Sequence, residues 1–283
     1  MMKLTVLGSG SPEAYARRAS SGYLVEIGED RILFDCGGGV FDNLLRSGRL
    51  PRDITHIVFS HLHSDHMMDY ARLVHAAWDE GGAAIKVYGP DPIKAITEGY
   101  FGPNGVMAHD LWARTELKPS QEVWLARGGT LPRPWPNPEV CEISPGDVIE
   151  GGGWQIKSCE VPHAQPALTC MGFALMYDDK TFVYSGDAAI CDDMETLCQD
   201  ADLLLHWCYR LDGQKAHPVM HALTPTPSQI AAMATRCRVK QLMLTHFRIN
   251  MDDEAGHKNA SKAMRAEFDG LIGIVEDLDS YSI

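Results

Sequence analysis

The run HLHSDH, residues 61–66, constrains the fold of this chain more than any other feature of the sequence. It follows directly on HIVFS, an apolar segment that is typical of a buried strand. His61 and His63 are two residues apart, so in an extended loop their imidazoles point the same way. Asp65 and His66 then come as the chain enters a helical pattern. Histidine nitrogen with carboxylate oxygen is a ligand set that suits zinc, with manganese and iron as alternatives. The run therefore predicts a metal site at the end of a buried strand.

Three further candidate ligands each follow an apolar, strand-like segment later in the chain. They are His163 after SCEVP, Asp187 in VYSGDAA and His246 in LMLTHF. Loops that follow strand ends are where functional side chains gather in α/β folds. Together with the first run they make a set of candidate ligands from four strand ends, which is enough for two metal ions.

The pattern of apolar segments falls into two similar series, each rich in strands first and flanked by helices later. The expected strands are residues 3–7, 22–27, 31–35, 56–60 and 86–90 in the first series and 154–161, 171–177, 180–186, 202–206 and 240–246 in the second. Helical spacing indicates helices at 40–47, 67–78, 192–199 and 227–236. We therefore expect two β-sheet layers covered on the outside by helices, within a single domain spanning residues 1–283.

The segment 100–137 fits this rhythm poorly. It is rich in glycine and proline and holds Trp112, Trp124 and Trp135. We expect this aromatic insertion to be a lid over a pocket or a subunit interface, the second of which would make the protein a homodimer.

Composition limits the classes of partner and compartment. The formal net charge is −13 and no run of lysine and arginine stands out, whereas a nucleic-acid partner usually shows itself as a basic stripe. The eight cysteines are scattered without a CxxC pair, which is typical of reduced thiols in a cytoplasmic protein. We see no signal peptide and no apolar stretch long enough to span a membrane.

Six motifs in order along the chain resemble those of the metallo-β-lactamase superfamily. HLHSDH matches the signature HxHxDH, and LGSGSP, FDCGGG, VPH, SGD and LTHF match the surrounding elements of that superfamily. The resemblance implies a four-layer αββα sandwich with two metal ions, most readily zinc. The residues it implies as ligands are His61, His63 and His163 for one ion, Asp65, His66 and His246 for the other, and Asp187 as the bridge between them. It also implies that Asp35 orients a ligand imidazole by a hydrogen bond.

Two bound cations would share a hydroxide, because metal binding lowers the pKa of water towards neutrality. We expect that hydroxide to attack the substrate while Asp65 steers its proton, which predicts a metal-dependent hydrolase.

Within the superfamily the chain is most similar to the ribonuclease Z-like branch, through LLLHWCYR and HPVMHALTPTPSQIA. Trp207 stands where that branch carries a glutamate, so His221 lacks its usual partner for protonating the leaving group. The 164–186 segment is also too short for the arm with which tRNA-processing members grip their substrate. From these departures we expect a nucleic acid to be an unlikely partner.

These departures favour a small organic, aromatic substrate carrying a lactone, ester, amide, sulfate ester or activated aryl halide. Trp207, Arg210 and His206 are then the expected substrate contacts, with His221 as a candidate catalytic residue. The alternatives are a ribonuclease Z-like phosphodiesterase acting on RNA or small nucleotides, and a non-hydrolytic di-iron redox or binding protein on the same fold.

Overall fold

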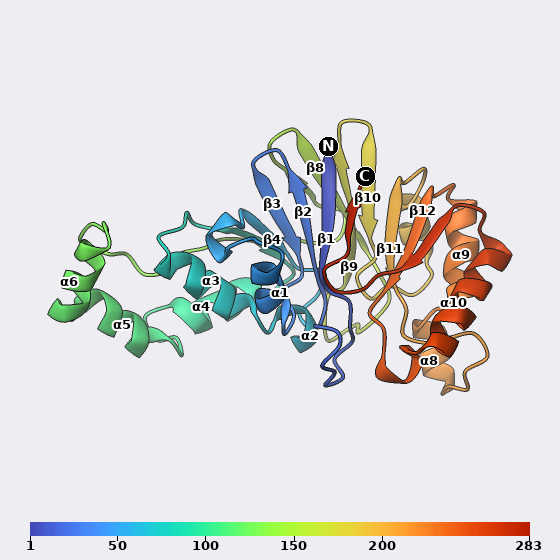
Figure 1. The fold of residues 1–283 in the computed structure, drawn as a ribbon, viewed down its shortest axis with the longest axis horizontal. Helices are drawn as coiled ribbons and strands as arrows, with labels where there is room; N and C mark the ends of the chain where they lie inside the picture. Colours follow the sequence, from blue (N-terminus) through green and yellow to red (C-terminus); the bar gives the residue numbers. More distant parts are fainter.

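Two seven-stranded sheets stack face to face in the computed structural model, which describes all 283 residues, and helices cover both outer faces (Figure 1). The first sheet has the order β14-β1-β2-β3-β4-β5-β6. Its strands are β1 Met2–Gly8, β2 Gly22–Ile27, β3 Asp30–Phe34, β4 His56–Val58, β5 Lys86–Gly89, β6 Glu139–Glu142 and β14 Ser280–Ser282. The predicted αββα sandwich is confirmed.

The second sheet repeats this plan in the order β13-β12-β11-β10-β9-β8-β7. Its strands are β7 Val148–Glu150, β8 Trp154–Glu160, β9 Met171–Tyr177, β10 Lys180–Tyr184, β11 Leu203–Trp207, β12 Gln241–Thr245 and β13 Leu271–Ile274. Strands β3 to β6 run parallel in one sheet and β10 to β13 run parallel in the other. The carboxyl ends of parallel neighbours meet at one edge of a sheet, which is where the candidate ligands follow their strands.

Ten α-helices connect these strands. They are α1 Val40–Arg46, α2 Ser64–Met67, α3 Tyr70–Asp79, α4 Ile93–Phe101, α5 Ala108–Glu116, α6 Lys118–Ala126, α7 Asp192–Leu197, α8 Pro218–Leu223, α9 Pro227–Arg236 and α10 Glu254–Glu267. Two short 3-10 turns lie at η1 Pro51–Asp53 and η2 Ile249–Met251. The helix expected at 227–236 is confirmed in full, and the Thr226 backbone N–H donates to Gln229 Oε1 at 2.9 Å at its start.

One hydrophobic core lies between the two sheets. Phe34 of the first sheet packs on Phe173 and Phe182 of the second, with ring centroids 5.8 and 5.9 Å apart. Two further cores bury the outer faces of the sheets, one beneath α1, α3 and α4 and the other beneath α7, α9 and α10. All ten strand segments expected from apolar patterning are present. The strands that patterning missed, β6, β7, β13 and β14, are short and bury almost none of their residues, so they carry little periodic signal.

The 100–137 segment contains two helices where patterning gave no clear structure. Helices α5 and α6 extend away from the sandwich at one end of the molecule (Figure 1), and α6 buries none of its side chains. A helix with no buried face shows no clean apolar stripe, which is why sequence periodicity did not reveal it.

None of the helices combines the length and apolar content that crossing a membrane would require.

Candidate metal centre

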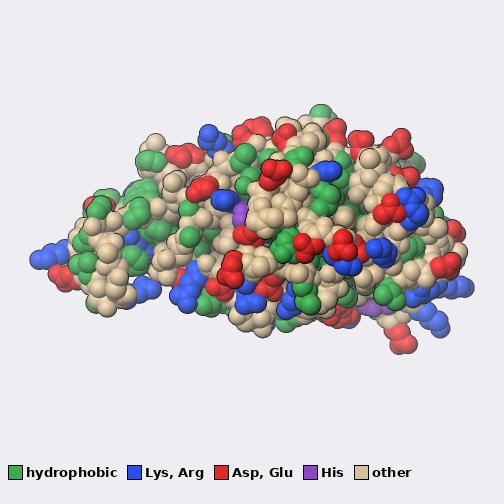
Figure 2. Space-filling view, turned by 90° about the horizontal axis from the view of Figure 1, so that it is seen from above, with side chains coloured by type: hydrophobic (Ala, Val, Ile, Leu, Met, Phe, Trp, Pro, Cys, Tyr) green, Lys and Arg blue, Asp and Glu red, His purple; other side chains and the backbone are tan.

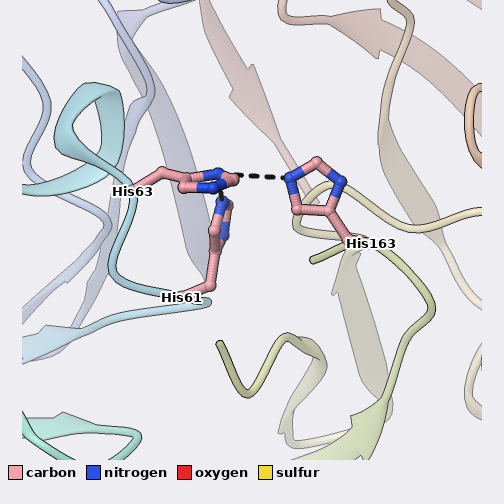
Figure 3. Close-up of side chains that lie close together, drawn as sticks. All are labelled: His61, His63 and His163. Carbon is pink, nitrogen blue, oxygen red and sulfur yellow. Dashed lines mark hydrogen bonds between the residues drawn. The ribbon is translucent and has the colours of Figure 1, made fainter. Parts of the chain in front are cut away.

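His61, His63 and His163 bring three imidazoles together from loops that follow different strands. His61 and His63 follow β4, and His163 follows β8. His61 Nε2 lies 2.9 Å from His63 Nδ1, which in turn lies 3.2 Å from His163 Nε2 (Figure 3). Three histidine nitrogens that converge in this way form one candidate ligand group.

Asp65, His66 and His246 form a second group beside the first. Asp65 Oδ2 lies 3.2 Å from His246 Nε2 and 3.5 Å from His66 Nε2. Asp65 and His66 belong to α2, and His246 directly follows β12, so this group joins the two sheets. All three residues are buried.

Asp187 lies between the two groups. Its Oδ1 is 3.5 Å from His66 Nε2, while its Oδ2 is 3.5 Å from His246 Nε2 and 3.6 Å from His163 Nε2. One carboxylate thus contacts ligands of both groups, and its role as the bridge stays a prediction.

The residues present fit a pair of cations. His66 Nε2 and Asp187 Oδ1 are buried atoms that have no hydrogen-bond partner. Buried polar atoms are nearly always partnered, so two unpartnered atoms that face each other suit a cation held between them. The mixture of imidazole and carboxylate suits zinc.

In this cluster the imidazoles and carboxylates each favour the charged form of their neighbours. Burial opposes protonation of His66, but Asp187 and Asp35 outweigh it and raise the pKa of this imidazole well above its ordinary value. Burial likewise opposes ionisation of Asp187, but His246 and His66 outweigh it and hold the pKa of this carboxyl well below its usual range. Without a metal, a protonated His66 and an ionised Asp187 balance each other, and a bound cation would take the place of the His66 proton.

Asp35 occupies the position behind these ligands that the sequence resemblance implied. Its Oδ2 lies 2.8 Å from His66 Nδ1 and accepts hydrogen bonds from Tyr184 Oη at 2.7 Å and Ser60 Oγ at 2.7 Å, while its Oδ1 accepts from the Ser60 backbone N–H at 2.8 Å. Bonding at Nδ1 turns Nε2 of His66 toward Asp187. Asp35 adopts a left-handed backbone (φ 57°), a conformation that aspartate tolerates better than most residues.

The predicted substrate contacts lie deeper than the sequence suggested. Trp207 is only 3% exposed and packs its ring on two ligand imidazoles, with centroids 5.3 Å from His163 and 5.6 Å from His246. Arg210 is buried, and its Nη2 donates to the Thr224 backbone carbonyl at 3.0 Å. Their assignment as substrate contacts stays a prediction.

The two remaining histidines of the prediction differ sharply from each other. His206 is fully buried, with Nδ1 2.8 Å from the Trp207 carbonyl, and burial lowers its pKa to about 4. It is therefore neutral at physiological pH and unsuited to donate a proton. His221 is exposed on α8 and its side chain makes no hydrogen bond.

Sequence reasoning missed Tyr209, which lies at the rim of the centre. Its ring is half-buried, with centroids 5.8 Å from His246 and 5.7 Å from Trp207. The sequence did hold a signal for Tyr209, because it comes two residues after Trp207 and alternate side chains of an extended chain point to the same side.

Comparison with known proteins places this geometry in a family. Residues 30–247 match the beta-lactamase superfamily domain, which is more than half of the chain. The chain belongs to the metallo-β-lactamase superfamily. Within the superfamily the chain belongs to the ribonuclease Z-like branch, as the sequence motifs indicated. The protein is a hydrolase, and its His and Asp groups are suited to bind metal.

Relatives of this superfamily member match over nearly their whole length. Ribonuclease Z of Mycobacterium bovis (strain BCG / Pasteur 1173P2) is 28% identical over 288 residues, covering 98% of this chain and 97% of the relative. Among solved structures, the metallo-beta-lactamase fold protein YhfI from Bacillus subtilis has a TM-score of 0.76 at 21% identity and full coverage of both chains. Human tRNase Z, short form, has a TM-score of 0.71 at 21% identity and 99% coverage of both chains.

The expectation that nucleic acid is an unlikely partner is wrong. The full-length relatives named ribonuclease Z overturn it. The net charge of −13 misled because it sums over the whole chain, whereas phosphate contacts depend on a few local cations.

Proposed function

We propose that this protein is a zinc-dependent phosphodiesterase that hydrolyses a phosphodiester bond in RNA. The observation that carries the proposal is the convergence of six histidine and aspartate side chains around Asp187, which contacts both ligand groups. Two-metal sites of this kind suit displacement at phosphorus, where attacking and leaving oxygens both need charge stabilisation. Full-length similarity to proteins named ribonuclease Z, and a TM-score of 0.67 to a diphosphatase from the PhnP family, support phosphate chemistry.

The protein's own side chains hold and orient the centre. His61, His63 and His163 would hold one zinc ion, and Asp65, His66 and His246 the other, with Asp187 shared. When bound, the ions supply Lewis acidity and acidify a water molecule. The Asp65 carboxylate, whose Oδ2 lies 3.2 Å from His246 Nε2, would accept a proton from a water molecule bound there.

Two residues near the centre shape its surroundings. Trp207 excludes water from behind the His163 and His246 imidazoles, and this low-dielectric wall strengthens their interaction with charge. Tyr209, at the rim, lies 5.8 Å from the His246 ring and carries the Arg248 guanidinium over its own ring at 4.6 Å. His221 remains our candidate for protonating the leaving group, supported by its exposure on α8.

A substrate panel tests the proposal. The zinc-loaded protein would be assayed on bis(p-nitrophenyl) phosphate, on an RNA hairpin with a 3′ extension, and on lactones, aryl esters and aryl sulfates. We expect kcat/KM on the two phosphodiesters to exceed that on the other substrates at least tenfold. Higher kcat/KM on a lactone or an aryl ester would refute phosphodiester specificity and favour the small organic substrate expected from the sequence. A His221→Ala variant should lower kcat on RNA more than on bis(p-nitrophenyl) phosphate, whose p-nitrophenolate departs without protonation.

We also propose a cytoplasmic location. All eight cysteines are unpaired in the structure, which suits a reducing compartment.

A further inference from the structure

Three arginines converge on one aspartate where the α5–α6 helices meet the rest of the molecule. Asp79, at the end of α3, lies 3.4 Å from Arg114, 3.7 Å from Arg127 and 3.0 Å from Arg133, measured from carboxylate oxygen to guanidinium nitrogen. These residues and Trp124 line a hollow of about 260 Å³. We call these three arginines with Asp79 the arginine cluster.

One arginine of the cluster is held rigidly. The Arg133 guanidinium lies between two indoles, 3.7 Å from the Trp78 ring and 4.1 Å from the Trp124 ring. Its side chain is 5% exposed, and its Nε is buried without a hydrogen-bond partner. A pre-organised guanidinium loses little entropy when it binds an anion, and its donor capacity is not used up within the protein.

Positive charge is in excess at the arginine cluster. Besides Asp79, the only carboxylate paired with it is Asp110, whose Oδ2 lies 2.9 Å from Arg114 Nε. Three guanidinium groups therefore face two carboxylates, in a chain whose net charge is −13. Arg114 and Arg127 are about half exposed, so both can reach a ligand in the hollow. Guanidinium groups bind phosphate oxygens with paired hydrogen bonds, which makes a phosphate group the fitting ligand.

We propose that the arginine cluster binds a backbone phosphate of the RNA substrate, far from the bond that is cleaved. This inference rests on the proposed function. Helices α5 and α6 lie at one end of the molecule and α2, which carries Asp65 and His66, lies near its centre (Figure 1), so only an extended polymer can occupy both sites. Acidic and basic side chains are interspersed over the face seen in Figure 2, with no continuous basic band. On this face, local sites such as the arginine cluster would supply the attraction for RNA.

Arg127→Gln tests the proposal, with Arg238→Gln as its matched control. Both arginines are more than half exposed and ion-paired, Arg127 with Asp79 and Arg238 with Asp200. RNA binding would be measured by fluorescence anisotropy across a salt series with the zinc-loaded, full-length proteins. Hairpin cleavage and bis(p-nitrophenyl) phosphate hydrolysis would be measured alongside.

We expect Arg127→Gln to raise Kd and KM for the RNA by roughly three- to tenfold and to reduce the salt slope by about 1. Kinetics on bis(p-nitrophenyl) phosphate should not change, because that substrate cannot span the two sites, and Arg238→Gln should match the wild type throughout. The double variant Arg114→Gln/Arg127→Gln should raise Kd and KM for RNA further. Its kinetics on bis(p-nitrophenyl) phosphate should still match the wild type.

Three results would overturn the proposal. They are an Arg127→Gln effect on RNA no larger than that of Arg238→Gln, an equal loss on bis(p-nitrophenyl) phosphate, and no RNA binding by the wild type. If the wild type cleaves RNA but the variants match it, the arginine cluster is not an RNA site while the proposed function stands. If the wild type cleaves neither phosphodiester, the proposed function itself fails.

Discussion

Asp35→Asn is the change that most directly probes how the fold prepares the metal centre. Asp35 is fully buried, and its two oxygens meet Ser60, His66 and Tyr184. Asparagine has nearly the same shape and tolerates the left-handed backbone equally well, so the variant alters the hydrogen bonding and the charge but little else. It replaces one of these acceptor oxygens by an NH₂ group, which can only donate.

Neither orientation of the new amide satisfies its surroundings. If the NH₂ replaces Oδ1, it faces the Ser60 backbone N–H, which then loses its acceptor. If the NH₂ replaces Oδ2, it faces His66 Nδ1, and the proton of that imidazole must move to Nε2. A proton on Nε2 occupies the atom that faces Asp187 and the proposed metal. An unsatisfied buried group costs about 1–3 kcal/mol, and loss of a bond that orients a ligand lowers metal affinity roughly 10–100-fold.

Metal content and stability can be measured separately. Zinc affinity would be measured by competition with a chromophoric chelator, and the free energy of unfolding by urea titration in EDTA. Tyr184→Phe is the matched control, because it removes one donor to the same Oδ2 but leaves the carboxylate in contact with His66. We expect the control to stay within about threefold of wild-type affinity, since the imidazole is still held. An Asp35→Asn variant with wild-type zinc affinity would refute the argument that this carboxylate orients His66.

Three further predictions follow from buried groups elsewhere in the structure. Asp187→Ala should lower zinc content below two per chain, measured by elemental analysis, and abolish phosphodiester hydrolysis; full activity with both ions bound would refute the bridging role. Trp207→Phe removes the indole N–H bond to the Ala188 carbonyl (2.5 Å) and part of the packing, so urea titration should show a loss of about 1–3 kcal/mol; no loss would mean that the site repacks. Asp252→Asn leaves the buried Arg18 without its carboxylate, so we expect a loss of about 3–5 kcal/mol at pH 7. Burial opposes ionisation of Asp252, but Arg18 outweighs burial and lowers the pKa of this carboxyl in the folded protein. The stabilisation from the ionised carboxylate is therefore complete at pH values above the pKa of unfolded aspartate, near 3.9, and is lost progressively as the pH falls below it. The difference between wild type and Asp252→Asn should therefore shrink as pH falls below about 4, and a constant difference would contradict the assignment.

Periodicity in the sequence was sufficient for the parts of the fold that bury an apolar face. Strands such as β4 and β11 are continuous runs of buried residues, and α9 has proline and a capping pair at its start. Short edge strands and the α5–α6 helices escaped prediction because they bury little, so nothing in their local pattern distinguishes them from loops.

The candidate ligands were identifiable from sequence because each follows a strand end, and parallel strands bring their ends to one edge. The sequence by itself therefore determined the chemical class of the site, a set of imidazole and carboxylate groups suited to bind metal. Only the tertiary structure decided which atoms meet, with Asp187 reaching both ligand groups and Asp35 reaching His66.

The tertiary structure also decided how deeply Trp207 is buried. It likewise brought three arginines together around Asp79, namely Arg114, Arg127 and Arg133. The contacts around Asp79 join residues up to 54 positions apart in the sequence, as between Asp79 and Arg133. Burial and charge pairing depend on those contacts, whereas local patterning carries information over only a few residues.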